Sequence, residues 1–197
     1  SHAHRPMLEP NHREPGVAIE MIVGIIGVDT YYGRITRKDR VIDALVTLAF
    51  DYPKRAKFFR KELIAFLILA REEELDPLQP LGSYAGAMGR PQFMPSSFRD
   101  YAVDATGDCK RYIWNNWADV AGSVANYFLE HGWRPGEEVA AQATLGHGWA
   151  GPKPEPRNTL TPSETVDSLS ARGVMFATDL PADSKGELLA YVGNDGR

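Results

Sequence analysis

The stretch VAIEMIVGIIGVDT, residues 17–30, is apolar on nearly every side when it is drawn as a helix. A helix of this kind is normally buried, because it has no polar face to turn toward water. Gly24 and Gly27 lie three residues apart and would let a neighbouring element approach closely. The pattern therefore predicts a central, buried helix over residues 17–30.

Further helical patterns follow along the chain. Apolar residues recur at helical spacing over 39–50, with Asp39 as the expected N-cap, and then over 53–74 and 120–131, while a shorter helix is expected to begin at Pro95. The sequence contains no internal repeat and no alternation of strands with helices. It predicts a mainly α-helical body.

The composition changes after Trp133. Residues 146–162 are rich in proline and glycine, which is typical of a loop or linker. Beyond them, Thr161 with Glu164 three residues later predicts a capping box at the start of a short helix. We therefore expect residues 17–133 to form the core, and residues 134–197 to form a linker and a small appendage of the same unit.

The composition excludes several classes of protein. The 197 residues carry a net charge of −4 and contain no basic stripe with interleaved aromatic residues, which argues against nucleic acid as a partner. The apolar runs are far shorter than the roughly 20 residues that span a bilayer, so no transmembrane segment is predicted. A single cysteine, Cys109, excludes an internal disulfide and a cysteine-rich zinc site. Residues 1–16 lack the apolar core of a signal peptide and are interpreted as a disordered lead-in or a cloning remnant.

Asp29 is the first candidate for chemistry. It lies near the C-terminal end of an apolar helix, where desolvation and the negative end of the helix dipole both favour the protonated carboxyl. Glycosidases use a carboxyl of this kind as the general acid that protonates the leaving oxygen. The alternative is that Asp29 caps the following turn or pairs with a nearby arginine.

A second candidate is the segment GSYAGAMGRPQFMPSSF, residues 82–98. It combines small residues with the hydroxyl of Ser83, the amide of Gln92, the thioether of Met94 and the aromatic rings of Tyr84 and Phe93. Such a mixture on a loop between helices suits a sugar-binding cleft. A glycine-rich helix connection without a binding role is equally compatible with the pattern.

The segment DATGDCKRYIWNNWAD, residues 104–119, begins like a calcium-binding loop. Asp104, Thr106 and Asp108 place oxygens at the first, third and fifth positions of an EF-hand-like loop. Later positions depart from that pattern, since Cys109 replaces the glycine of position six and Asn115 the glutamate of position twelve. A turn with solvated aspartates remains the alternative.

Basic residues crowd the N-terminal half of the helix predicted over 53–74. The helix dipole disfavours cations there, so the cluster indicates either an anionic ligand or a solvated face. Its members are Lys54, Arg55, Lys57, Arg60 and Lys61.

Six blocks between Gly16 and Trp133 stand in order and nearly without gaps: GVAIEMIVGIIGVDTYYGR, DALVTLAFDYPKRAKFF, FLILAREEELDPL, GSYAGAMGRPQFMPSSF, YAVDATGD and AGSVANYF. Together they resemble the B-type family of bacterial lytic murein transglycosylases. The resemblance implies a mainly α, lysozyme-like helical catalytic domain with a small C-terminal appendage. It also implies cleavage of the link between N-acetylmuramic acid (MurNAc) and N-acetylglucosamine (GlcNAc) in peptidoglycan without water, leaving 1,6-anhydromuramyl ends.

The resemblance carries further expectations about cofactors, partners and location. No cofactor is required, although calcium can occupy the EF-hand-like loop in some family members. The expected partners are peptidoglycan glycan strands and cell-wall synthases. The expected location is the bacterial periplasm, and anchoring to the outer membrane in a full-length protein stays open.

By resemblance, the catalytic acid/base falls on Asp29, where the family has a glutamate. The cleft positions fall on Ser83, Gln92, Met94, Arg55 with Lys54, and Tyr127, and the calcium positions on Asp104, Thr106 and Asp108 with Asp119 as a late ligand displaced by one residue. One carboxyl suffices, because it first protonates the leaving oxygen and then acts as the base.

Two departures from the family limit these expectations. The aspartate retracts the carboxyl by roughly 1 to 1.5 Å, and a 1 Å misplacement can cost on the order of a hundredfold in rate. A tyrosine-containing block of the family lies beyond Arg197, so the cleft is expected to be incomplete. An inactive peptidoglycan-binding protein and a hydrolysing lysozyme are the alternatives.

Overall fold

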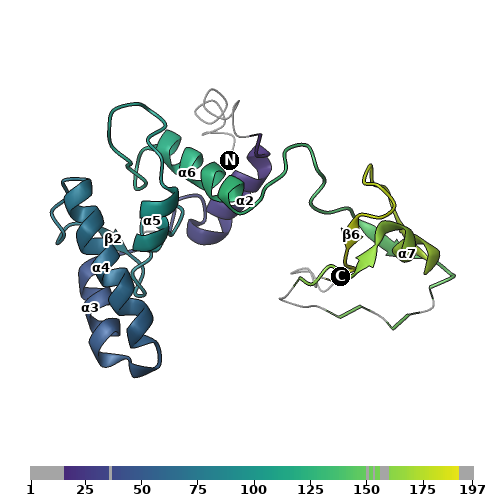
Figure 1. Cartoon of the computed structure of the whole chain (residues 1–197), viewed down its shortest axis with the longest axis horizontal. Helices are drawn as coiled ribbons and strands as arrows, with labels where there is room; N and C mark the ends of the chain where they lie inside the picture. The colour runs from purple at the N-terminus through teal and green to yellow at the C-terminus, as the bar shows by residue number, and fades with distance from the viewer. Residues whose placement is uncertain (1–15, 36, 150, 153, 156–159, 191–197) are drawn as a thin grey trace. The chain divides into compact units, whose positions relative to one another are not determined.

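The computed structural model describes residues 16–35, 37–149, 151–152, 154–155 and 160–190 (Figure 1). The chain divides into two compact units, residues 1–135 and residues 136–197, and each is considered by itself. The interpretation of the first sixteen residues as a lead-in lies, up to residue 15, outside the described residues.

The first unit is built from helices joined by loops. They are α2 (Ile19–Thr30), α3 (Val41–Asp51), the 3₁₀ turn η1 (Pro53–Arg55), α4 (Ala56–Glu72), α5 (Pro95–Tyr101) and α6 (Trp117–Glu130). Helices α3 and α4 pack side by side, and α2 lies against α6 (Figure 1). The predicted helical body is confirmed, with boundaries within a few residues of those expected.

A short strand pair joins two distant parts of this unit. Strand β1 (Asp39–Arg40) runs antiparallel to β2 (Leu81–Gly82), with Asp39 opposite Gly82. The prediction that Asp39 caps α3 is wrong, because its backbone is engaged in this strand and Arg40 occupies the N-cap position.

Helix α2 is less enclosed than its sequence predicts. Ile22, Ile26 and Thr30 are buried, but Val28 is 85% exposed and Ile25 is 39% exposed to solvent among the described residues. A methyl group at Gly24 would meet no described atom within 4 Å, whereas one at Gly27 would lie 2.8 Å from Cζ of Tyr32. The helix therefore buries a single stripe of residues. The close approach at Gly27 is made by Tyr32, in the turn that follows the helix.

The core lies between the helices of the first unit. Its largest fully buried side chains come from α2, α3, α4, α5, α6 and the loops before α5 and α6, and include Ile22, Leu45, Phe66, Leu69, Met88, Phe98, Ile113 and Val120. One buried carboxylate, Glu62 on α4, accepts hydrogen bonds from the backbone N–H and the hydroxyl of Ser96 at 2.9 and 2.8 Å. It thereby accepts a hydrogen bond from the first turn of α5, where backbone N–H groups have no partner within the helix.

The described residues of the second unit form two strand pairs and one short helix. Strand β3 (Ala143–Leu145) pairs with β5 (Val174–Phe176), and β4 (Glu164–Thr165) pairs with β6 (Lys185–Gly186), both antiparallel. Helix α7 (Val166–Ala171) begins with a capping box made by Thr165 and Ser168. The predicted box of Thr161 and Glu164 is wrong, because Glu164 is drawn into β4 and pairs with Arg172.

No helix within the described ranges is long and apolar enough to cross a bilayer.

Candidate functional site

Asp29 is the penultimate residue of α2 and is half-buried. Desolvation raises the pKa of its carboxyl above the ordinary value, and the positive charge of Arg37 opposes this shift without cancelling it. Helix α2 places the carboxyl at its C-terminal end, where the helix dipole also disfavours a negative charge. The group is therefore suited to hold a proton and donate it.

The turn that follows Asp29 has an unusual backbone. Tyr31, Tyr32 and Gly33 have positive φ angles of 49°, 57° and 77° in succession. The left-handed region costs a side-chain-bearing residue about 1 kcal/mol or more, so two tyrosines in it need compensation from their surroundings. Thr30 supplies part of this: its buried hydroxyl donates to the Ile26 carbonyl oxygen and accepts the Gly33 N–H, both at 3.1 Å.

Arg90 holds the other side of the same turn. Its guanidinium donates to the carbonyl oxygen of Gly33, to that of Trp114 at 2.8 Å, and to Oδ1 of Asn115 at 3.4 Å. It also lies over the ring of Trp117, 5.5 Å from the ring centroid. A side chain at residue 33 would collide with this guanidinium, since its Cβ would be 2.8 Å from Cζ of Arg90. Arg90 therefore ties the end of α2 to the loop that contains Trp114.

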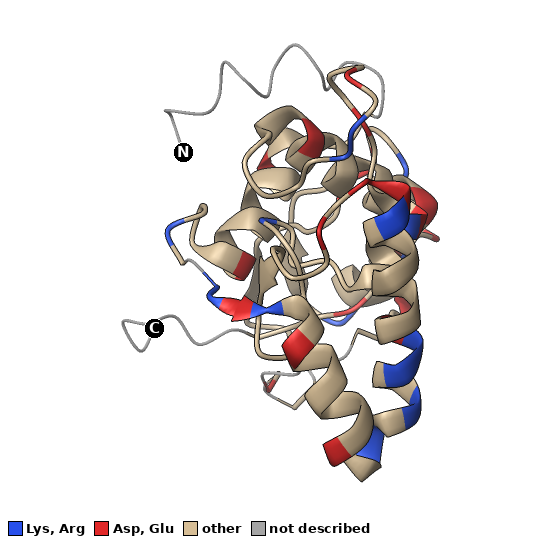
Figure 2. Ribbon diagram, turned by 90° about the vertical axis from the view of Figure 1, so that its left-hand side faces the viewer, with Lys and Arg blue, Asp and Glu red and all other residues tan. Residues whose placement is uncertain are grey.

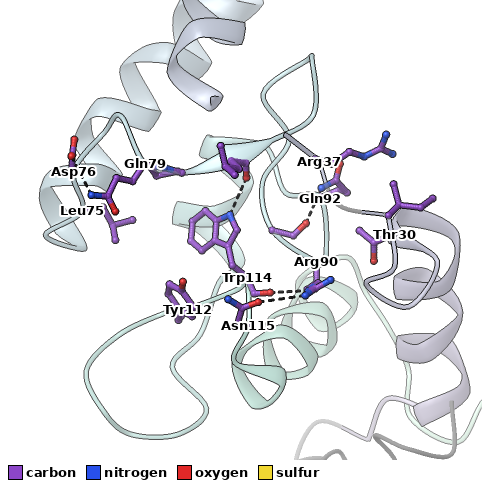
Figure 3. A pocket seen from close by; sticks show the side chains of 14 residues that line it. Thr30, Arg37, Leu75, Asp76, Gln79, Arg90, Gln92, Tyr112, Trp114 and Asn115 are labelled. Atoms are coloured by element: carbon purple, nitrogen blue, oxygen red, sulfur yellow. Dashed lines mark hydrogen bonds between the residues drawn. The ribbon is translucent and has the colours of Figure 1, made fainter. Parts of the chain in front are cut away.

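A pocket of about 400 Å³ opens beside this junction (Figure 3). Four segments of the chain enclose it: the end of α2 with the turn after it, the segment from the end of α4 into β2, the loop before α5, and the loop after α5. The lining residues are Thr30, Ile35, Arg37, Leu75, Asp76, Gln79, Pro80, Leu81, Gly89, Arg90, Gln92, Tyr112, Trp114 and Asn115. Its volume falls within the range of about 300 to 1,000 Å³ that is typical of small-molecule sites.

The glycine-rich loop contributes Gln92 to this pocket. Gln92 has a positive φ of 51°, and its side-chain amide nitrogen donates to the Gly89 carbonyl oxygen at 2.7 Å (Figure 3). Ser83 has a different task in this structure, since its buried hydroxyl oxygen accepts the backbone N–H groups of Ala85 and Ala87. Met94 is half-buried and packs against the core.

Gln92 is the one predicted cleft residue that the described pocket lining contains, since Ser83, Met94 and the three others lie outside it. Tyr127 on α6 is 37% exposed, stacks on His131 with ring centroids 4.0 Å apart, and contacts the ring of Phe93 in the glycine-rich loop. Arg55 lies over the ring of Phe58 at 4.4 Å, and Lys54 beside it in η1 is exposed. Figure 2 shows basic residues spread along α4 and acidic residues gathered at its C-terminal end.

Several pocket residues were missed by sequence reasoning. Arg37, Gln79, Tyr112, Trp114 and Asn115 line the pocket but were not proposed as site residues. The segment Tyr112 to Asn115 carried a usable signal, because two aromatic residues and an amide surround one apolar residue at the end of the twelve-residue EF-hand-like loop.

The EF-hand-like loop is organised by hydrogen bonds from its own backbone. Burial alone would raise the pKa of Asp104, but hydrogen bonds from the N–H groups of Gly107, Cys109 and Asp108 and from Thr106 lower it on balance. The buried carboxylate of Asp119 accepts the N–H groups of Ala105 and Tyr112 at 2.9 and 2.8 Å.

The acidic oxygens of this loop accept hydrogen bonds from the loop's own N–H groups. Within the described part of the chain, no group of three or more histidine, cysteine, aspartate or glutamate side chains is gathered as a metal site would require. Calcium binding at Asp104, Thr106, Asp108 and Asp119 stays a prediction.

Comparison with known proteins places this geometry in a family. The sequence profile of the transglycosylase SLT domain, SLT_2, matches residues 1–197. Membrane-bound lytic murein transglycosylase B of Escherichia coli (strain K12) is 48% identical over 159 residues, which cover 81% of this chain and 42% of that protein. The chain thus spans less than half the length of this curated relative.

Solved structures give the same result. The crystal structure of soluble lytic transglycosylase SltB1 from Pseudomonas aeruginosa is 49% identical, with a TM-score of 0.86 and coverage of 99% of this chain and 64% of that one. SltB3 from Pseudomonas aeruginosa, in complex with NAG-anhNAM-pentapeptide, is 29% identical, with a TM-score of 0.82 and coverage of 98% and 52%. The predicted mainly α, lysozyme-like fold is confirmed, and the chain belongs to the SLT_2 family of transglycosylase domains.

Proposed function

We propose that this protein is a peptidoglycan lytic transglycosylase that cleaves the bond between MurNAc and GlcNAc without water. The observation that carries the proposal is the half-buried carboxyl of Asp29, whose pKa is raised at the C-terminal end of α2. Membership of the family and the saccharide–peptide ligand of SltB3 support it.

The chemistry needs one carboxyl in two successive roles. Protonated Asp29 donates its proton to the glycosidic oxygen as the bond from that oxygen to C1 of the muramyl sugar breaks. The resulting carboxylate then takes the proton of the C6 hydroxyl of the same sugar while the C6 oxygen bonds to C1. The proton returns to Asp29, no water is consumed, and the product is a 1,6-anhydro ring.

Substrate contacts are assigned to side chains around the carboxyl. Gln92 keeps its carbonyl oxygen available for a sugar hydroxyl or amide N–H, because its amide nitrogen donates to Gly89. Ser83, Met94 and Tyr127 are proposed as further cleft contacts. Lys54 and Arg55 are proposed to attract the carboxylates of the lactyl and peptide groups, since both cations are exposed.

The same proposal covers partners and location. Peptidoglycan glycan strands are the expected partner, and cell-wall synthases are proposed as protein partners. The periplasm is the proposed compartment, since this substrate is extracytoplasmic and the curated relative is named as membrane-bound. Attachment of a longer form to the outer membrane belongs to the same hypothesis.

Digestion of purified murein sacculi followed by mass spectrometry tests the function. Products with 1,6-anhydro ends support the transglycosylase, products with reducing ends indicate a hydrolysing lysozyme, and binding to sacculi without any release indicates a binding protein. Asp29→Asn should abolish release. Asp51→Asn is the matched control, because Asp51 also ends a helix but is exposed.

A further inference from the structure

We propose that one face of the hairpin formed by α3 and α4 binds a membrane surface that carries anionic phospholipids. Four exposed apolar side chains define this hairpin face: Val46 and Phe50 on α3, and Ile64 and Leu67 on α4. None of the four lines the pocket beside α2, and Asp29 lies on another helix. The proposal therefore stands apart from the proposed function.

Helical spacing places these four side chains on one surface. Val46 and Phe50 lie four residues apart on α3, so they share one side of that helix. Ile64 and Leu67, three residues apart, share one side of α4 in the same way. Arg60 of α4 connects the two pairs, because its guanidinium lies over the ring of Phe50, 5.4 Å from the centroid, and donates to a backbone carbonyl oxygen of α3 at 3.0 Å. The helices pack side by side in opposite directions (Figure 1), so Ile64, one turn beyond Arg60, is level with Val46.

The apolar side chains of the hairpin face are unusually exposed. Phe50 is 62% exposed to solvent, Ile64 is 59% exposed and Leu67 is 48% exposed. Single exposed apolar residues are ordinary on protein surfaces, but several side by side mark a surface that a partner covers. Contact with an apolar layer would remove their area from water, which favours binding.

The charges around the hairpin face favour an anionic partner. Lys57 and Lys61 on α4 are exposed, and neither forms an ion pair with a described residue. On α3, Asp43 is paired with Arg40 at 2.7 Å, which leaves Asp51 as the unpaired carboxylate of that helix. The cations next to the face therefore outnumber the free acidic groups.

A lipid surface fits this combination of apolar and cationic side chains. An apolar face flanked by lysines is typical of helices that lie in a membrane interface, where the apolar groups enter the acyl boundary and the ammonium groups reach the headgroups. Anionic headgroups attract such cations. The turn between α3 and α4 also extends beyond the other helices of the first unit, so a broad, flat surface can approach it (Figure 1).

Co-sedimentation of the whole chain with lipid vesicles tests the proposal. We expect vesicles of phosphatidylglycerol and phosphatidylcholine in equal parts to bind about tenfold more tightly than vesicles of phosphatidylcholine alone. Raising the salt concentration from about 0.1 M to about 0.5 M should weaken this binding several-fold, because salt screens the lysines. Inorganic phosphate at millimolar concentration should not displace the chain, since a free phosphate ion offers no apolar layer.

Substitutions at exposed positions separate the apolar contribution from the charged one. Ile64→Gln removes an apolar side chain from the hairpin face, and we expect it to weaken vesicle binding about fivefold. Val28→Gln is the matched control, because Val28 is 85% exposed on another helix. Joint replacement of Lys57 and Lys61 by glutamine should weaken binding to the anionic vesicles about tenfold. Lys110→Gln, in the exposed EF-hand-like loop, should leave it unchanged.

Three outcomes overturn the proposal. The first is that the anionic vesicles do not bind, which would favour an acidic segment of a partner protein as the occupant. The others are equal binding to both kinds of vesicle, and equal binding by Ile64→Gln and Val28→Gln. Circular dichroism of each variant verifies that it is folded. The vesicles contain no murein, so failed digestion of sacculi would overturn the proposed function alone.

Discussion

The guanidinium of Arg90 donates a hydrogen bond to the carbonyl oxygen of Gly33, 57 residues earlier in the chain. This bond joins the loop before α5 to the turn after α2, the helix whose penultimate residue is Asp29. The same guanidinium donates to the backbone carbonyl oxygen of Trp114, so one side chain joins the turn after α2 to the loop before α6.

Replacing Arg90 should loosen this junction. Arg90→Met removes the donors to Gly33, Trp114 and Asn115, and we expect it to lower the free energy of unfolding by about 2 kcal/mol. Urea denaturation measures the change, with Arg71→Met on the exposed end of α4 as the control. If both variants are equally stable, the three hydrogen bonds contribute nothing measurable.

Lengthening the proposed acid should increase turnover. Asp29→Glu extends the carboxyl by one methylene, and we expect it to release muropeptides faster, by a factor of roughly 10 to 100, because positional errors near 1 Å cost about that much. Release from sacculi is measured by chromatography. Equal rates for the aspartate and glutamate forms would count against Asp29 as the catalytic acid.

The raised pKa of Asp29 also predicts a pH-dependent stability. The folded state binds this proton more tightly than the unfolded chain, so stability is lost as pH rises from about 4, the ordinary aspartate value, through the raised pKa. Asp29→Asn removes that loss, and its melting temperature should exceed that of the wild type at pH 7. The two should converge below pH 4, and a constant difference across this range would contradict the assignment.

Two glycines of α2 offer a matched pair. Gly24→Ala should be neutral or stabilising by up to about 1 kcal/mol, because the added methyl group meets nothing within 4 Å and alanine favours the helix. Gly27→Ala gains the same helix propensity but must displace the ring of Tyr32. We therefore expect Gly27→Ala to be the less stable variant in thermal melts, and the reverse order would show that Tyr32 does not pack there.

Calcium binding is testable without any assay of activity. If the EF-hand-like loop binds calcium, millimolar calcium should raise the melting temperature, and magnesium at the same concentration should raise it less. Asp104→Asn should remove the effect. An unchanged melting temperature in calcium would make a functional metal site in this loop untenable.

The local pattern of apolar residues was sufficient to predict where the helices lie. It was not sufficient to predict how buried they are or which residues cap them. The periodicity of apolar residues gave the positions of α3, α4 and α6, because side-chain spacing along a helix is a local property. It misjudged the burial of Val28, since composition does not say which face of an apolar helix meets a neighbour. Asp39 was misassigned as a cap because it lies in β1, and the box of Thr161 with Glu164 was misassigned because Glu164 lies in β4; in both cases strand pairing with distant residues overrode the local signal.

The site was harder to predict than the fold. Asp29 and Gln92 were found because helix-end chemistry and loop composition are visible in short stretches of sequence. The pocket was not found, because Thr30 at the end of α2, Gln79 and Trp114 belong to three separate parts of the chain that only folding brings together. The sequence around Arg90 gave no local sign that its guanidinium would join the turn after α2 to the loop that contains Trp114.

The contact between Glu62 and Ser96 constrains the order in which the chain folds. Helix α5 has seven residues, too few to persist alone in water, and its first turn depends on a carboxylate that lies 34 residues earlier on α4. The segment from the glycine-rich loop into α5 therefore cannot become native before α4 has formed. Kinetic measurements on Ser96→Ala should show slowed folding only if α5 docks in the rate-limiting step, so this pair reports when the loop beside Asp29 acquires its final shape.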